Sequence, residues 1–290
     1  MVRSYLRDGV DGWRLDVAFD IGPNYLSELT RAAHDEKPGS LVVGEIPNYP
    51  RDWLGPVDGV MHFALRHLIL RLAGGQISAP VFGAMVNRMV ADCGVESLLK
   101  SWIYLDNHDT PRLATSLPVE AARRLAQVLQ FTLPGSPNLY YGGEIDMQGG
   151  DDPTMRGPMR WEQVNDANPH LQWTKKLAHL HQSERALKLG NYRPILAEKL
   201  FAFERYTDHV ADTVLVLVNP GDSAVSETLM VANSKLMDGT HMIDLLGTQA
   251  GEPFTLRAAL LPVQLPAKSC LVLKPEVAPP GGYTNYKRVQ

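Results

Sequence analysis

The stretch "DGWRLDVA" (residues 11–18) decides how the first part of this 290-residue chain is expected to fold. A short apolar run ends at Asp16, and Arg14 stands two residues before it. Side chains two positions apart on a β-strand point to the same face, so the Arg14 guanidinium is expected to hold the Asp16 carboxylate ionised and oriented. An acidic residue directly after a strand is typical of the ligand-binding edge of a parallel sheet.

Four further strand-like runs follow in the first part of the chain, and segments with helical periodicity separate most of them. The runs are "LVVGE" (41–45), "VDGVMHF" (57–63), "SWIYLDN" (101–107) and "NLYYG" (138–142). Helices are expected over 25–35, 81–92, 119–132 and 170–189. Strands that alternate with helical segments predict an α/β domain with a parallel sheet over residues 1–190.

The pattern changes after Gly190 to alternating, β-branched runs separated by turn residues. These runs are "KLFAFERY" (199–206), "DTVLVLVNP" (212–220) and "KSCLVLKP" (268–275). They predict a small antiparallel, all-β domain over residues 191–276. The last residues, 277–290, are rich in Pro and Gly without an apolar period, and we expect a flexible tail there.

Composition excludes several classes of function. The chain is 44% hydrophobic and 21% charged, with a net charge of −4 and no cluster of basic residues, which disfavours nucleic-acid binding. No apolar stretch reaches the roughly 18 residues of a membrane span. The first residues lack the apolar core of a secretory signal, so a cytoplasmic location is expected. Cys93 and Cys270 fit no metal-ligand spacing and are expected to be buried free thiols.

Three acidic residues, Asp16, Glu45 and Asp109, stand at the C-terminal ends of three separate strand candidates, the last just past "SWIYLDN". In a barrel of parallel strands these ends open onto one face, where gathered carboxylates repel one another and raise the pKa of at least one. A carboxylic acid beside a carboxylate is what glycosidic bond cleavage needs, and a retaining mechanism places the two about 5 to 5.5 Å apart. Neighbouring strand ends, roughly 4.8 Å apart, can deliver that separation. Each of these carboxylates taken singly, and His108 likewise, is also compatible with a structural role as a cap or loop hydrogen-bonder.

Four motifs together resemble those of the α-amylase family of retaining glycoside hydrolases, especially its cyclomaltodextrinase, neopullulanase and maltogenic amylase branch. "DGWRLDVA" (11–18), "VVGEI" (42–46) and "LDNHDTPR" (105–112) are similar to its fourth-, fifth- and seventh-strand motifs. "GSPNLYYGGEIDMQGGDDPTMRGPMRW" (135–161) resembles its eighth strand and the following loop. The resemblance implies a partial (β/α)8 (TIM) barrel comprising about strands 4–8, followed by a small antiparallel β-sandwich domain.

The resemblance also implies roles for the three carboxylates. Asp16 would be the nucleophile, Glu45 the acid/base, and Asp109 the residue that grips sugar hydroxyls and stabilises the transition state. The remaining positions carried over are substrate-binding residues: Arg14 and His108 beside the carboxylates, and Asp152 and Arg156 at the rim of the first sugar subsite.

The substrates implied by the resemblance are α-glucans, with hydrolysis of α-1,4 and α-1,6 links in maltodextrin, cyclodextrin, pullulan or starch. No cofactor is expected. Many family members bind calcium partly through a Lys-His pair after the nucleophile, whereas "VAFD" follows Asp16 here, and Asp151 with Asp152 falls short of the six to eight oxygens of a calcium site. No metal site is therefore predicted.

Only eleven residues precede Gly12, whereas the family's first three barrel strands lie upstream of the fourth-strand motif. A sheet of strands 4–8 alone would have two exposed edges, so self-association that covers them is expected. Two alternatives to hydrolysis stay open. One is transglycosylation through the same covalent intermediate, and the other is a catalytically weak or inactive half-barrel that only binds α-glucan.

Overall fold

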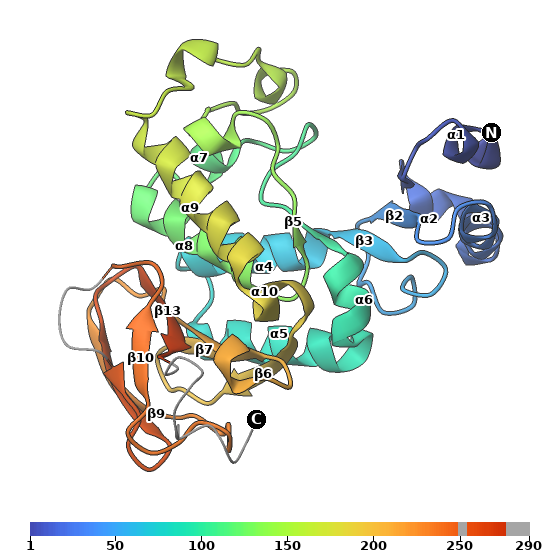
Figure 1. Cartoon of the computed structure of the whole chain (residues 1–290). Helices are drawn as coiled ribbons and strands as arrows, with labels where there is room; N and C mark the ends of the chain where they lie inside the picture. Colours follow the sequence, from blue (N-terminus) through green and yellow to red (C-terminus); the bar gives the residue numbers. More distant parts are fainter. Residues whose placement is uncertain (249–253, 277–290) are drawn as a thin grey trace.

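A parallel sheet and its helices form the first part of the computed structural model, which describes residues 1–248 and 254–276 (Figure 1). The sheet holds β1 (Gly12–Leu15), β2 (Leu41–Ile46), β3 (Gly59–His62), β4 (Trp102–Ile103) and β5 (Ser136–Pro137), paired in chain order. All four pairings are parallel. The predicted parallel α/β sheet is therefore confirmed, while its assignment to about strands 4–8 of a partial (β/α)8 barrel stays a prediction.

Helices form most of the connections between these strands, as α/β crossovers require. Helix α1 (Val2–Arg7) precedes β1, and α2 (Ala18–Ile21) and α3 (Pro23–Glu36) lead to β2, whereas residues 47–58 between β2 and β3 form no helix. Between β3 and β4 come α4 (Phe63–Ala73), α5 (Ala79–Cys93) and α6 (Val95–Lys100), and between β4 and β5 come α7 (Leu113–Ser116) and α8 (Glu120–Thr132). After β5 come the single turns η1 (Gly143–Ile145), η2 (Thr154–Arg156) and η3 (Trp161–Gln163), then α9 (Pro169–Ser183) and α10 (Arg185–Leu189). Among the described residues no helix is long and apolar enough to cross a bilayer.

The start of β1 shows how the opening motif sets the sheet. A Cβ atom at Gly12 would collide with the backbone of Leu41 on β2, so glycine allows the two strands to pair from this residue. Trp13 and Leu15 then pack toward α1 and α3, against Leu6 and Leu26. By strand alternation Arg14 faces the other side of the sheet, where the candidate site lies.

The predicted strand 138–142 is wrong, because β5 comprises only Ser136 and Pro137. The Asn138 backbone still donates to the Ile103 carbonyl (2.8 Å), but the Asn138 carbonyl accepts from the Gln130 side chain of α8 instead of continuing the sheet. The strand predicted over 101–107 is likewise shortened to two residues. Beyond it the carbonyl of Leu105 accepts from Arg66 (2.8 Å). At Asn138 and at Leu105 a side chain thus donates to a carbonyl that would otherwise bond a neighbouring strand.

Two helix predictions also change. The helix expected over 170–189 is interrupted at Glu184, which has extended backbone angles and an ion pair from its carboxylate to Lys274 (2.6 Å). Helix α4 was not predicted, because its apolar run follows β3 without a turn. The His62 side chain marks the boundary by accepting from the Leu65 backbone N–H (3.4 Å), as an N-cap does.

An antiparallel region follows α10 and consists of two sheets. The larger sheet has the order β11-β10-β13-β8-β7-β6, and the smaller pairs β12 with β9. The bounds are β6 (Asn191–Ile195), β7 (Phe201–Tyr206), β8 (Val214–Asn219), β9 (Val225–Met230), β10 (His241–Asp244), β11 (Phe254–Thr255), β12 (Leu260–Leu265) and β13 (Ser269–Pro275), with the turn η4 (Val210–Asp212) before β8. Residues 277–290, where a flexible tail was predicted, lie outside the described residues.

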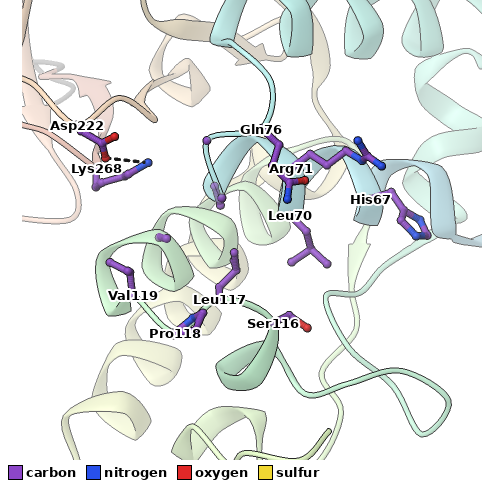
Figure 2. Close-up of a pocket in the computed structure, with 14 residues that line it drawn as sticks. His67, Leu70, Arg71, Gln76, Ser116, Leu117, Pro118, Val119, Asp222 and Lys268 are labelled. Carbon is purple, nitrogen blue, oxygen red and sulfur yellow. Dashed lines mark ion pairs between the residues drawn. The ribbon is translucent and has the colours of Figure 1, made fainter. Parts of the chain in front are cut away.

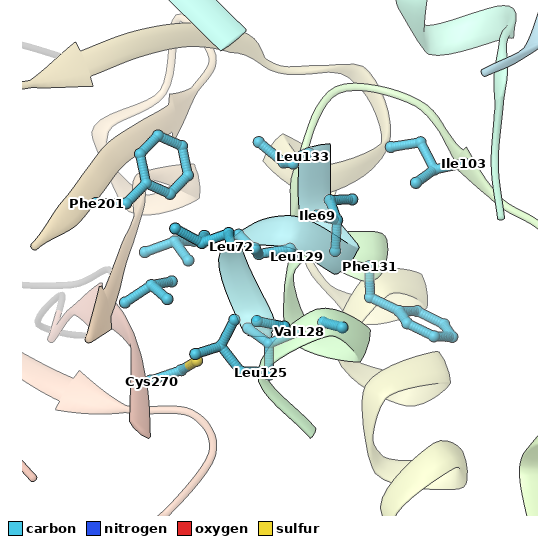
Figure 3. Packing of buried hydrophobic residues seen from close by; sticks show 14 of the residues in the cluster. Ile69, Leu72, Ile103, Leu125, Val128, Leu129, Phe131, Leu133, Phe201 and Cys270 are labelled. Atoms are coloured by element: carbon cyan, nitrogen blue, oxygen red, sulfur yellow. The ribbon is translucent and has the colours of Figure 1, made fainter. Parts of the chain in front are cut away.

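The larger antiparallel sheet is buried on both faces. On β8 the valines 214, 216 and 218 belong to the same core as α4, α5 and α8, whereas Leu215 and Leu217 face the core shared with β9 and β12. Figure 3 shows Phe201 and Cys270 of this sheet beside helix residues Leu72 and Leu125. The segments 1–190 and 191–276 therefore share one hydrophobic core, and a domain boundary between them stays a prediction.

One buried arginine links the two segments. Arg205 on β7 is fully buried, and its guanidinium donates to the carbonyls of Thr132 (2.8 Å) and Gly190 (2.9 Å). Burial lowers the pKa of Arg205 to about 9, which reflects how completely its charge is removed from water. These carbonyls end α8 and α10, so the charge satisfies groups that helix ends leave without partners.

We expect Arg205→Met to lower the free energy of unfolding by about 2–4 kcal/mol, because two buried carbonyls lose charged donors. Urea denaturation followed by circular dichroism would measure the loss. Arg31→Met, at an exposed position on α3, is the matched control and should change stability little. Equal midpoints for both variants would contradict a structural role for Arg205.

Candidate active site

The Arg14 guanidinium lies between two of the predicted carboxylates. Its Nη1 is 2.5 Å from Asp16 Oδ1, and its Nη2 is 3.0 Å from Glu45 Oε1. Arg14 Nε also contacts the sulfur of Met61 on β3 (3.5 Å), which fixes the guanidinium plane from a third strand. The structure thus brings together Arg14, Asp16 and Glu45 as the sequence predicted from adjacent strand ends.

Asp16 and Glu45 differ strongly in exposure. The Asp16 side chain, one residue beyond β1, is 73% exposed, whereas that of Glu45, within β2, is 12% exposed. Val17 has a left-handed backbone (φ 42°), which is unfavourable for a β-branched residue. In that turn the Val17 backbone N–H donates to the Glu45 carboxylate (Oε2, 3.0 Å). A backbone-to-side-chain hydrogen bond therefore also joins the two strand ends.

Asp16 is held in its ionised form. The hydrogen bond from Arg14 lowers the pKa of the Asp16 carboxyl, and partial desolvation opposes this effect. The charge of Arg14, the neighbouring Glu45 carboxyl and the charge of His108 lower the pKa further. An exposed carboxylate with a depressed pKa can act as a nucleophile at neutral pH.

A second group of predicted residues surrounds Asp109. Its Oδ2 is 3.1 Å from His108 Nε2, and its Oδ1 is 3.0 Å from Arg156 Nη2. Arg156 Nε also donates to the His108 carbonyl (2.8 Å) and lies 3.3 Å from Asp152 Oδ1. His108, Asp109, Asp152 and Arg156 therefore form one cluster, and the charge of His108 acts on Asp16 of the first group.

Apolar side chains from three strands form the floor between the two groups. Val43, Met61 and Tyr104 are buried in one cluster, with Phe63 and Trp102 packed against it. These residues lie on the same face of the sheet as Arg14 and Glu45, as the strand register requires. A buried apolar floor lowers the local dielectric constant and so strengthens the electrostatic interactions of the charged groups near it.

Arg112 was missed by the sequence analysis, although it positions part of the site. Its fully buried guanidinium donates to the carbonyls of Met155 (2.7 Å) and Tyr141 and lies 4.2 Å from the Tyr140 ring centroid. It thereby holds the segment that carries Arg156 and Asp152. Arg112 follows "NHDTP", a stretch without the apolar periodicity that could indicate burial, so the sequence does not distinguish it from an exposed loop residue. Only the fold reveals its contacts.

One well-formed cavity lies away from these residues. It has a volume of about 680 Å³ and is bounded by α4, the connection between α7 and α8, and the Lys268–Asp222 ion pair. Figure 2 shows Leu70 pointing from α4 toward Ser116 across it. None of the seven predicted site residues lines this cavity. The candidate active site therefore lies at the open strand ends and not in this cavity.

Comparisons with known proteins agree on one family. Residues 1–188 match the family model described as alpha amylase, catalytic domain. Neopullulanase 2 of Thermoactinomyces vulgaris is 33% identical over 274 residues, covering 91% of this chain and 46% of its own length. A Bacillus cyclomaltodextrinase is 30% identical over 247 residues, covering 83% of this chain and 43% of its own. The acarbose-soaked structure of a debranching enzyme from Nostoc punctiforme superimposes with a TM-score of 0.78 at 26% identity, over 94% of this chain and 59% of that one.

This chain belongs to the α-amylase family. It spans less than half the length of the curated relatives described above. The predicted resemblance to this family is therefore confirmed. The roles that it implies for Asp16, Glu45 and Asp109 stay predictions.

We expect Arg14→Gln to raise the pKa of Asp16, because the hydrogen bond and charge that lower it are removed. A carboxyl with a depressed pKa is ionised above that pKa and loses its charge as pH falls, so the variant would lose the Asp16 charge at a higher pH. Carbon-13 NMR titration of the carboxyl would measure the change.

The control for this titration is Arg3→Gln, whose guanidinium lies 3.9 Å from Asp35 at the surface. It should leave the Asp16 resonance unchanged. An Asp16 titration that is identical with and without Arg14 would contradict the geometry described above.

Proposed function

We propose that this chain carries the catalytic centre of a retaining glycoside hydrolase that acts on α-glucans. The observation that carries the proposal is the Arg14 guanidinium shared by Asp16 and Glu45. A shared guanidinium favours the short carboxyl separation, about 5 to 5.5 Å, of retaining enzymes. The relatives' names, neopullulanase and cyclomaltodextrinase, support α-glucans as the substrate class.

In the proposed mechanism Asp16 attacks the anomeric carbon while the glycosidic bond breaks. Glu45 gives its proton to the leaving oxygen and becomes a carboxylate, so the first step yields a free sugar and a glycosyl ester of Asp16. Glu45 then takes a proton from a water molecule whose oxygen attacks the same carbon, which releases Asp16. The exposure of Asp16 suits its role, because the nucleophile must reach the sugar ring.

Asp109 would stabilise the positive charge that develops on the sugar ring and accept hydrogen bonds from its hydroxyls. Its two oxygens are held by His108 and Arg156, which fixes the carboxylate at the mouth of the site. Arg156 and Asp152 together would form the rim of the first subsite. The links proposed for cleavage are α-1,4 and α-1,6, and a cytoplasmic location stays a prediction.

We expect Glu45→Gln to lower the rate of hydrolysis of pullulan, β-cyclodextrin or starch by about 10²–10⁴-fold, because the proton donor is lost. Reducing-sugar release by the purified 290-residue chain would measure it, and proton NMR of the first product would show whether the anomeric configuration is retained. Glu96→Gln, at an exposed position on α6, is the matched control and should keep full activity.

Three other outcomes would change the proposal. Equal, negligible rates for the parent chain and Glu45→Gln would contradict catalysis by this chain. Glucan binding that survives Asp16→Asn without hydrolysis by the parent would favour the non-catalytic alternative. Products longer than the substrate at high maltose concentration would favour transglycosylation, which passes the sugar of the same intermediate to another sugar.

We also propose that the 290-residue chain self-associates. β1 lies at the edge of the parallel sheet, with one side unpaired among the described residues. Beside it Val17, Phe19, Ile21 and Tyr25 are exposed by 39%, 36%, 37% and 62%. An unpaired edge next to exposed apolar side chains favours association.

Light scattering of the chain at micromolar concentration should therefore give a mass above the 32.1 kDa of one copy. Phe19→Asp should shift the population toward single copies, because a charge enters the apolar surface. Val119→Asp, at an exposed apolar position on another face, is the control. A single species at the mass of one copy would contradict the proposal.

A further inference from the structure

The hydroxyl of Tyr104 is a buried polar group that the mechanism above does not use. Tyr104 is 0% exposed, and its hydroxyl oxygen has no hydrogen-bond partner among the described residues. Buried hydroxyls in folded proteins nearly always have a partner, because desolvation without one costs stability. A completely buried phenol without a partner is therefore a candidate for a functional contact.

The position of Tyr104 connects it to the acid/base residue. Glu45 pairs with Met61 and Met61 pairs with Trp102, so these residues stand side by side on three strands. Tyr104 follows Trp102 by two residues and thus lies on the same face, where it packs in one cluster with Met61. The sulfur of Met61 contacts Arg14, which in turn holds Glu45.

Phe63 at the start of α4 fixes the Tyr104 ring. The two rings meet edge to face with centroids 5.3 Å apart, and the Arg66 guanidinium lies 5.8 Å from the Tyr104 centroid. Arg66 is itself tied to the Leu105 carbonyl (2.8 Å). The ring therefore has little freedom to turn toward solvent.

The charges around Tyr104 keep it a neutral donor. Burial raises the pKa of the phenol, and Arg66 opposes this effect. The charges of Glu45 and Asp109 raise the pKa further, whereas Arg14 lowers it. The two carboxylates of the site are thus the anionic groups whose charge raises the pKa of the phenol, and that of Glu45 has the larger effect.

We propose that Tyr104 is a positioning residue for Glu45, whose carboxylate accepts a hydrogen bond from the Tyr104 hydroxyl, directly or through one water molecule, after giving its proton to the leaving oxygen. This inference rests on the proposed function of Glu45 as the acid/base. The hydroxyl keeps its own proton throughout, and the bond stabilises the Glu45 carboxylate during the covalent stage. A buried phenol does not touch the sugar, so substrate binding does not depend on it.

The test uses Tyr104→Phe, which removes the hydroxyl and keeps the ring. Carbon-13 NMR of the Glu45 carboxyl, assigned with Glu45→Gln, should give a titration midpoint about 0.5–1 pH unit higher in Tyr104→Phe, the size expected for one hydrogen bond. In active protein the basic limb of the kcat/KM profile should move upward by the same amount, with KM unchanged.

Tyr192→Phe is the matched control. Tyr192 is also buried, but its hydroxyl donates to Asn87 (2.7 Å) outside the site, so its loss should leave the Glu45 titration unchanged. Identical Glu45 titrations in the parent and Tyr104→Phe would overturn the proposal. The NMR titration needs no turnover, so an inactive chain would contradict the proposed function without deciding the role of Tyr104.

A second measurement covers the case in which Tyr104→Phe does not fold. In the parent chain the ring-carbon resonance beside the Tyr104 hydroxyl should change with pH at the midpoint of the Glu45 carboxyl, because the bond forms when that carboxyl ionises. Glu45→Gln should abolish the change. A Tyr104 resonance that is insensitive to pH in this range would overturn the proposal.

Discussion

The ion pairs of Arg14 with the two carboxylates of Asp16 and Glu45 are the contacts on which the candidate site depends. Two acidic side chains on adjacent strands repel each other unless a cation lies between them. The guanidinium offers separate nitrogens to each, and the Met61 sulfur and the floor beneath keep it in place. The positive charge of Arg14 therefore allows two carboxylates to lie at neighbouring strand ends.

That arrangement requires a rigid sheet, and the antiparallel region contributes to it. Helices α4, α5 and α8 pack on one face of the six-stranded sheet, with Val216 and Phe203 in the same core. Arg205 joins the ends of α8 and α10 from within that sheet. The all-β segment therefore supports the helices behind the site, although it supplies none of the predicted site residues.

Arg112 and Arg205 show why part of the structure could not be predicted. Both side chains are fully buried and bond backbone carbonyls of segments distant in sequence. A periodicity argument assigns arginine to the surface, because burial of a charge costs energy unless acceptors surround it. The acceptors become visible only when the chain is folded, and the same is true of the interruption at Glu184, where Lys274 is the partner.

The sequence by itself determined the parallel α/β character of the first part, the β character of the second, and the family, because alternation, helical periodicity and strand-end motifs are local properties. It also identified Arg14, Asp16, Glu45, Asp109, His108, Asp152 and Arg156 as candidate residues. Only the tertiary structure decided that these form two clusters, that strands β4 and β5 are short, and that Tyr104 packs with Met61, the strand partner of Glu45. Contacts between distant segments depend on packing, which no local pattern encodes.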